Sequence, residues 1–555
     1  MTTNEKIEKP ERGFRKWGKL VVLSLALAII IIDTTILNVS LSTIIRDFNT
    51  SIQNIQWVIT AYSLVLAALT ITGGRMGDFF GRKRMFMIGA VIFAIGSFLC
   101  SISTNVPMMI WGEAIIEGIG AALMMPATAS ILVANFRGKD RAIAFGVWGG
   151  IAAAASAIGP ILGGWLTTNY SWRWGFRINV FVVALLLLGS FLIPESHDTE
   201  EKPSLDFGGV ILSAVGLLSL VFGFIEASTY GWWKSKATFI AFKHALAMPF
   251  GLSIVPPALL IGAIFLALFI LWERIVDRGE GTPLVSLSLF KNKQFMSGVA
   301  VTSIMALGQA GLIFSIPVFL QSVRNLDAFH TGLNFLPMSL TALFVAPLSV
   351  VLFSKISPKI KIVIGLLANT LGFLVLRHQL SVDTTTLQLA PGFILFGLGI
   401  GAAMAATSNL TLSAVSPQEA GEASGLNNTM RQVGSTLGSS IIGAILLTAL
   451  STNLATGIDK STVIPTPLKP QITQAVSSQT SNVEFGGGAQ FSGRLPKAIT
   501  NEIVSISHQA TVDADKRALS YGAVFAALGA LVGIIFLPNS TNVEQEVSAA
   551  KHKKA

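Results

Sequence analysis

The chain has 555 residues, of which 52% are hydrophobic and only 12% are charged. An ordinary soluble domain is about 25% charged, so this composition excludes a typical soluble protein and favours a membrane protein. The single cysteine, Cys100, excludes an intramolecular disulfide. The formal net charge of +10 is compatible with nucleic-acid binding, but its distribution along the chain indicates membrane topology instead.

Residues 1–18 are polar and basic and precede a long apolar run. That run has about 24 residues, whereas the apolar core of a signal peptide has roughly 7–15, and no small-residue cleavage pattern follows it. We therefore expect a tail at residues 1–18 and an uncleaved first membrane span after it.

Crossing about 30 Å of hydrocarbon takes roughly 20 apolar residues. The sequence predicts fourteen such spans, at 19–42, 55–74, 84–103, 107–134, 141–168, 176–194, 207–229, 252–272, 294–321, 331–354, 361–378, 388–415, 425–452 and 518–538. Between two of them, residues 230–256 are ambiguous and are compatible with an interfacial or re-entrant helix.

Lysine and arginine gather in alternate connecting segments, which include GRKR (81–84), RGKDR (137–141), SKISPKIK (354–361) and KHKK (551–554). Short basic segments stay on the cytoplasmic side of a membrane. This distribution predicts a multi-pass protein of the cell membrane with both termini in the cytoplasm.

Residues 453–517 are rich in Ser, Thr, Asn and Gln and predict a long, flexible outer loop, parts of which are compatible with helix. The string EFGGGAQFSG (484–493) lacks the strand, helix start and Lys-Ser/Thr pair that phosphate binding needs. No Walker A sequence occurs, so we do not expect this chain to hydrolyse ATP by itself.

Charged residues inside a membrane are costly and usually face a cavity or a partner. Asp33 and Glu117 each lie roughly 15 Å from the outer end of their predicted spans. Glu113 precedes Glu117 by one helical turn on the same face. The three acids are therefore expected to line one cavity, where they would carry protons and attract cations. The alternative is a structural role, with each acid hydrogen-bonded to Ser, Thr or Asn of a neighbouring helix.

Two further charges lie in or near the spans. Glu226 is near a span end, where a charged side chain can reach the interface, although it is also a candidate substrate-binding residue. Arg431 lies near the inner end of its span. It is a candidate for substrate binding or gating, and a structural ion pair is an equally good interpretation.

The segment GGRMGDFFGRKRM (73–85) joins the second and third predicted spans. Its glycines permit close approach and a tight turn, and its charged groups suit pairing or helix capping. It resembles the loop signature of the major facilitator superfamily, apart from Met76 and Gly77. The resemblance implies that this loop latches two halves of the protein and controls switching, through Gly74, Asp78, Gly81, Arg82 and Lys83.

The string ASAIGPILGG (155–164) lies in the fifth predicted span. A proline bends a helix, and glycines permit intimate packing. The string resembles the antiporter signature of exporters in the same superfamily, with Ala155 in place of its first glycine. The resemblance adds Gly159, Pro160, Gly163 and Gly164 to the conformational switch, together with Arg431, and favours export over uptake.

The stretch DTTILNVSL (33–41) resembles the first span of the fourteen-span drug:proton antiporters of this superfamily, in which the corresponding acid is implicated in proton coupling. One departure concerns AIIEGIGAA (114–122), where Ala114 stands in the place of the family's arginine and Glu117 in that of its glutamine. We therefore expect Glu113 and Glu117 to act as additional titrating groups, in a cavity suited to cations.

The resemblance implies an all-α membrane fold of two six-helix bundles with two inserted helices. The expected division is a tail at 1–18, a bundle at 19–194, a linker with the inserted pair at 195–284, a bundle at 285–538 and a tail at 539–555. Small-residue contacts between helices would allow the bundles to rock against each other.

The expected function is proton-coupled efflux of lipophilic, cationic drugs by alternating access. Proton coupling is assigned to Asp33, Glu113 and Glu117, and substrate binding to the same acids with Glu226. Export of lipids or other amphiphiles is the alternative, and a transport-inactive receptor is a third hypothesis. We expect no enzyme activity, cofactor, metal or nucleic-acid partner. The partners are a lipophilic small molecule, protons and membrane lipids, and the expected state is a monomer.

Overall fold

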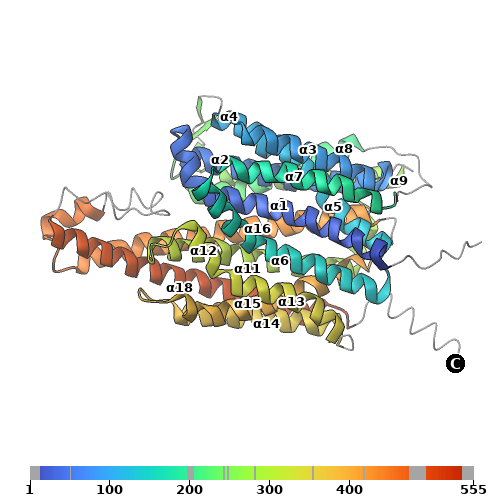
Figure 1. Ribbon diagram of the computed structural model, residues 1–555. Coiled ribbons are helices and arrows are strands. Elements are labelled where there is room, and N and C mark those ends of the chain that lie inside the picture. Colours follow the sequence, from blue (N-terminus) through green and yellow to red (C-terminus); the bar gives the residue numbers. More distant parts are fainter. Residues whose placement is uncertain are drawn as a thin grey trace, which may run out of the picture.

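The computed structural model describes residues 13–50, 52–196, 206–241, 244–246, 249–279, 283–352, 356–416, 419–473 and 496–539. Thirteen helices in these ranges are long and apolar enough to cross a membrane. Helices of this kind satisfy their backbone hydrogen bonds internally, as a spanning segment must. The predicted helical membrane fold is confirmed (Figure 1).

The first half contains α1 (Gly13–Phe48), α2 (Ile52–Phe80), α3 (Arg82–Ser101), α4 (Val106–Met109), the π-helix η1 (Ile110–Glu117), α5 (Gly118–Asn135), α6 (Gly138–Asn169), α7 (Arg173–Gly189) and the short η2 (Ser190–Leu192). Two further helices follow, α8 (Phe207–Tyr230) and α9 (Val255–Arg278). Between them lie the strands β1 (Phe239–Ala241) and β2 (His244–Leu246) and the short η3 (Pro249–Gly251).

The second half contains α10 (Leu287–Lys291), α11 (Lys293–Ser322), α12 (Ala328–Asn334), α13 (Leu336–Leu352), α14 (Pro358–Gln379), α15 (Thr386–Leu412), α16 (Ala420–Lys460), η4 (Thr466–Leu468) and α18 (Lys497–Phe536). The predicted span at 331–354 corresponds to α12 and α13, which are separate helices. The apolar part of α13, Leu336–Ser349, is shorter than the thirteen spanning helices.

In the described part of the ambiguous segment at 230–256, two short strands and η3 stand where the sequence is compatible with an interfacial helix. Strands β1 and β2 pair antiparallel, with Phe239 opposite Leu246 and Ala241 opposite His244. Gly231 ends α8 with a φ of +85°, a value that glycine adopts without strain. The Ser253 hydroxyl joins the two ends of the segment by donating a 2.6 Å hydrogen bond to the Gly231 carbonyl.

The predicted loop at 453–517 is helical at both ends, because α16 continues to Lys460 and α18 begins at Lys497. Buried apolar residues explain the extension, since Leu454 and Ile458 of α16 share one cluster with Ile499 and Ile503 of α18. Each pair has the one-turn spacing of an amphipathic helix. The glycine-rich string at 484–493 lies outside the described residues.

The two halves repeat one packing pattern. In the first, α1 packs on α6 and α7, and α3 on α5; in the second, α11 packs on α16 and α18, and α14 on α15. The inserted α8 and α9 pack on each other, and α8 also contacts α2 and α16. Helices α6 and α13, and α2 and α16, join the halves (Figure 1).

Gly438 sets the spacing of α16 and α11. A Cβ placed there would lie 2.1 Å from the Leu307 carbonyl oxygen, whereas one on Gly308 would meet nothing nearer than 3.9 Å. We expect Gly438→Ala to force the helices apart, cost about 1–3 kcal/mol and lower the unfolding temperature of the purified protein. Gly308→Ala is the control and leaves it unchanged. Tryptophan fluorescence during heating measures both, and equal unfolding temperatures would contradict the prediction.

Candidate functional site

Asp33 is the first member of a buried polar cluster in the first half. It lies within α1, is 1% exposed, and accepts a 2.6 Å hydrogen bond from Nδ2 of Asn179 on α7. The same nitrogen lies 2.9 Å from Ser97 Oγ of α3 and 3.3 Å from Glu117 Oε1. One amide therefore links four helical segments. We call Asp33, Ser97, Glu113, Glu117 and Asn179 the acid cluster.

Glu113 and Glu117 enter the cluster from η1, a π-helical stretch between α4 and α5. Such stretches inside α-helices occur frequently at functional sites. Both glutamates are fully buried. Ser97 donates to Glu117 Oε1 over 2.5 Å, and Cys100 Sγ lies 3.8 Å from Glu113 Oε2.

None of the described ion pairs includes a carboxyl group of the acid cluster. One oxygen each of Asp33, Glu113 and Glu117 is buried without a hydrogen-bond partner in the described chain. One carboxylate oxygen of Glu113 and one of Glu117 also lie within 4.8 Å of each other. A carboxylate has no hydrogen-bond donor, so two carboxyl groups can bond to each other only where one carries a proton. The arrangement can therefore hold a proton.

An acid outside the spans shows the opposite environment. Asp47, near the end of α1, accepts hydrogen bonds from Trp172 Nε1 (2.8 Å) and Arg173 Nη1 (2.9 Å). These bonds hold the pKa of Asp47 below its usual value. In the acid cluster, by contrast, Ala114 fills the position where the family resemblance expects arginine, and it is fully buried among apolar residues.

The cluster also has donor atoms of the kind that bind metals. Cys100, Glu113 and Glu117 each place one potential ligand atom within 4.8 Å of the others. Their sulfur and carboxylate atoms are a mixed donor set. Our expectation that the protein needs neither metal nor cofactor stays a prediction.

Glu226 lies on a helix that contributes no member to the acid cluster. Glu226 lies on the inserted helix α8 and is 6% exposed. It is close enough to Tyr230, one turn later, to interact with it electrostatically. Its assignment to substrate binding stays a prediction.

Arg431 lies between the halves, on α16. Its Nη2 lies 3.6 Å from Met125 Sδ of α5. It takes part in none of the ion pairs within the described ranges, so the structural ion-pair interpretation finds no support there.

The segment at 73–85, which is helical except at Gly81, joins the halves through Asp78 of α2. Its Oδ1 accepts from the Gly421 amide over 3.1 Å and its Oδ2 from the Glu422 amide over 3.0 Å, at the start of α16. Arg82 donates to Oδ1 over 2.8 Å. The carboxylate thus caps a helix of the other half, where the helix dipole favours a negative charge. We call Gly74, Asp78, Arg82, Gly421 and Glu422 the latch.

Glycines and a second ion pair complete this contact. A Cβ on Gly74 would lie 2.3 Å from the Gly421 carbonyl oxygen, so α2 and α16 meet backbone to backbone. Arg75 Nη1 lies 3.4 Å from Glu422 Oε2. Gly81 has a φ of +104° and lies beside Glu195, which accepts from the Lys83 amide over 3.0 Å.

Three glycines of α6 make close contacts on two sides. A Cβ on Gly159 would overlap Thr35 Oγ1 of α1, and one on Gly163 would lie 2.9 Å from Ile36. A Cβ on Gly164 would lie 3.1 Å from the amide of Phe329, at the start of α12. Pro160, within α6, packs beside Gly332 of α12. These residues therefore join α6 both to its own half and to the other.

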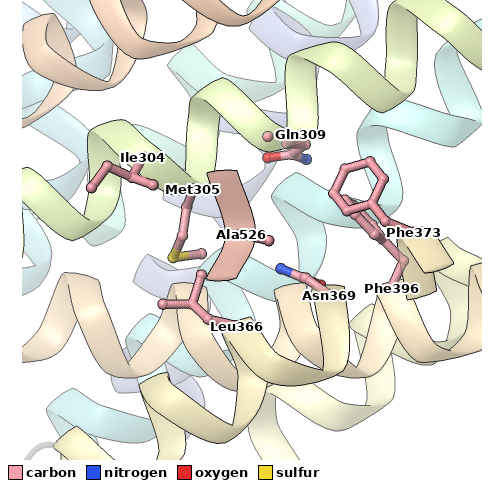
Figure 2. Close-up of a pocket in the computed structure, with 9 residues that line it drawn as sticks. Ile304, Met305, Gln309, Leu366, Asn369, Phe373, Phe396 and Ala526 are labelled. Atoms are coloured by element: carbon pink, nitrogen blue, oxygen red, sulfur yellow. The ribbon is translucent and has the colours of Figure 1, made fainter. Parts of the chain in front are cut away.

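A small pocket lies within the second half. It is lined by Ile304, Met305, Gly308, Gln309, Leu366, Asn369, Phe373, Phe396 and Ala526, from α11, α14, α15 and α18. Figure 2 shows the amides of Gln309 and Asn369 facing the same space, with the two phenylalanine rings on one side.

Sequence reasoning missed Ser97 and Asn179, which hold the acids together. Both are polar residues inside apolar helices, and Asn179 lies in the SWRWGFRINV string (171–180) that was part of the family resemblance. It also missed Asp515 and its partner Ser315, because the expected loop included Asp515. The signal was available in a carboxylate that lies three residues before the predicted span at 518–538.

This fold and site define a multi-pass membrane transporter. The Major Facilitator Superfamily profile matches residues 23–439, three quarters of the chain, so the protein belongs to that family. The human organic anion transporter MFSD10 has the same fold, with a TM-score of 0.58 at 12% identity, over 95% of this chain and 100% of that one. The proton:xylose symporter XylE has a TM-score of 0.56 at 11% identity, over 95% of this chain and 96% of that one.

Several of the chain's relatives are named for drug resistance or export. The multidrug efflux pump LfrA of Mycolicibacterium smegmatis is 30% identical, over 94% of this chain and 96% of its own length. The puromycin resistance protein pur8 of Streptomyces alboniger is 31% identical, covering 80% and 84%. The tetracenomycin C resistance and export protein of Streptomyces glaucescens is 28% identical, covering 78% and 76%.

The latch predicts a measurable effect on the first turn of α16. Asp78→Ala removes the acceptor for the Gly421 and Glu422 amides, and losing such a cap costs about 1 kcal/mol, so we expect their hydrogen exchange to become about fivefold faster. Asp140→Ala, which removes an exposed partner of Lys16, is the control. Exchange read by mass spectrometry over residues 419–426 measures both, and an unchanged rate in the Asp78 variant would contradict the cap.

Proposed function

We propose that the protein exports lipophilic, cationic compounds across the cell membrane in exchange for protons. Resistance and export functions among its relatives support efflux as the class of transport. One observation supports the proton and cation parts of this proposal. The acid cluster holds three buried carboxyl groups, two of them within 4.8 Å of each other, and none takes part in an ion pair of the described chain.

The chemistry of the exchange follows from that cluster. Three carboxylates side by side repel one another, so either protons or a cation must compensate their charge. A cationic substrate and protons therefore compete for the same acids. Protonation of Asp33, Glu113 and Glu117 releases the cation, and loss of the protons prepares the site for the next one.

The switch between the two access states uses the contacts between the halves. The latch closes one end, and Gly164 with Pro160 against α12 closes the other. Alternating access opens one end at a time. Arg431 contacts α5, the helix that continues from η1, and this position suits a role in transmitting the state of the acids to the second half.

We further propose that the latch faces the cytoplasm, because the basic segments 81–84 and 137–141 lie on that side. Both termini are then cytoplasmic, and the hairpin of α16 and α18 points outward. The division at 19–194, 195–284 and 285–538 fits the repeated helix packing. A single chain contains both halves, so a monomer suffices for transport.

Removing one acid tests the proton coupling. We expect Asp33→Asn to lower pH-gradient-driven efflux of ethidium at least about tenfold, because it deletes a proton-carrying group worth more than about 1.4 kcal/mol of coupling. Ethidium exchange without a gradient should persist. Proteoliposomes with purified protein measure both, and Asp513→Asn is the control because that acid is exposed. Unchanged coupled efflux in Asp33→Asn would remove the proton role.

Substrate charge is tested separately. We expect Glu117→Gln to weaken binding of the cation ethidium about tenfold, since it removes a negative charge worth on the order of 1.4 kcal/mol, and to leave binding of a neutral lipophile of similar size unchanged. Fluorescence titration of purified protein measures both affinities. Equal losses for the two compounds would contradict the cation preference. Copurified lipid with no bound dye would favour the lipid-export alternative instead.

A further inference from the structure

A second buried carboxyl group lies in the other half of the protein, outside the acid cluster. Asp515 of α18 and Ser315 of α11 are both fully buried, and the Ser315 hydroxyl donates to Asp515 Oδ1. The other carboxyl oxygen, Oδ2, is buried without a hydrogen-bond partner in the described chain. We propose that Asp515, held by Ser315, is a second proton-binding residue of the transport cycle. This inference rests on the proton-coupled export proposed above.

The repeat in the fold gives the pair of Ser315 and Asp515 a position equivalent to that of the pair of Asp33 and Asn179. Helices α1 and α7 are the first and last of the first half, and Asp33 and Asn179 bond across them. Helices α11 and α18 are the first and last of the second half, and Ser315 and Asp515 bond across them. Each half therefore joins its first and last helix through one buried acid and one neutral polar residue. The acid is on the first helix in one half and on the last helix in the other.

The surroundings of Asp515 are apolar on each helix that packs against α18. Leu312 and Ile316 of α11, Leu446 and Leu450 of α16 and Phe373 of α14 belong to the buried clusters there. These helices also carry titratable or charged residues in the described ranges. They are Lys293 on α11, Glu422, Arg431, Asp459 and Lys460 on α16, and Lys359, Lys361, Arg377 and His378 on α14. None of them forms one of the described ion pairs with Asp515.

On α18 itself, neighbouring Asp513 and Arg517 are exposed, and Lys516 is partly exposed. His508, partly buried, shares the face of Asp515 two turns earlier. An ionised carboxylate in such a place is tolerated only where water or a cation reaches it. Ionisation of Asp515 therefore requires the α11–α18 seam to open, and protonation lets it close. This links the charge of the residue to the conformation of the second half.

The same face of α18 offers a route to Asp515. His508, Thr511 and Asp515 have the spacing i, i+3, i+7, which places them along one side of the helix. One end of α18 projects beyond the other helices together with the end of α16 (Figure 1). Three turns deeper on that face, Ala526 lines the pocket that contains Gln309 and Asn369 (Figure 2). Asp515 thus lies between the projecting end of the helix and the pocket. The chemical step is reversible transfer of one proton from water to its carboxylate.

The coupling ratio tests this proposal. The full chain is reconstituted with ethidium as the probe and a pH gradient of one unit is imposed without a membrane potential. Each coupled proton multiplies the limiting ethidium gradient about tenfold, so we expect Asp515→Asn to lower that gradient about tenfold. Asp513→Asn is the matched control on the same helix, and Asp515→Glu should keep the wild-type gradient. A gradient in Asp515→Asn equal to that of the wild type overturns the proposal.

Two further measurements distinguish a failure of the Asp515 proposal from a failure of the proposed function and from misfolding of the variant. If the limiting ethidium gradient of the wild-type protein does not depend on the imposed pH gradient, the proposed function itself is wrong. If Asp515→Asn does not fold, Ser315→Ala takes its place, since it keeps the acid and removes its hydrogen bond. That variant should keep the limiting gradient but move the pH midpoint of transport. An unmoved midpoint shows a merely structural acid and overturns the proposal.

Discussion

Burying a carboxylate without a cation is costly, and the first half of this protein places three side by side. Packing cannot remove that cost, because the neighbours offer single donors such as Ser97 Oγ and one amide nitrogen of Asn179. In the proposed exchange, the charge is compensated by species that arrive and leave. Protons and a cationic substrate would both do so, and a site that must choose between them would couple their movements. Ala114, at the position where the family resemblance expects arginine, fits this proposal, since a resident cation would compensate the acids permanently.

The latch also contains a buried carboxylate, but hydrogen-bond donors of the protein satisfy its charge. The oxygens of Asp78 accept from two backbone amides of α16 and from Arg82. Arg82 belongs to the same half as Asp78, but the two backbone hydrogen bonds exist only while the halves are together. Separating the halves exposes the start of α16 and the Asp78 carboxylate to water at once. A contact of this kind breaks as a unit, which suits a switch between two states better than a gradual motion.

Sequence analysis predicted those features of the molecule that depend only on residues close together in the chain. A charge inside an apolar run is visible without a structure, so Asp33, Glu113 and Glu117 were all found, and the spacing of the glutamates placed them on one face. Ser97 and Asn179 were not found, because polar side chains of their size are compatible with a helix in many settings. The ends of α16 and α18 were missed for another reason. Hydropathy reports contact with lipid, whereas Leu454 and Ile499 are buried against another helix beyond the apolar run.

Transport further requires that the state of the acids reaches the second half, and the covalent structure provides one path. Segment η1 continues without a break into α5, so Glu117 and Met125 belong to one continuous helix and lie about 12 Å apart along its axis. Met125 contacts Arg431 of α16, the same helix whose first turn is capped by Asp78. In the proposed cycle, a rotation or shift of η1 on protonation would therefore act on the guanidinium end of the Arg431 side chain and on the helix held by the latch. A π-helical segment has a backbone register different from that of the α-helices on either side, and returning to α-helical register would produce such a shift.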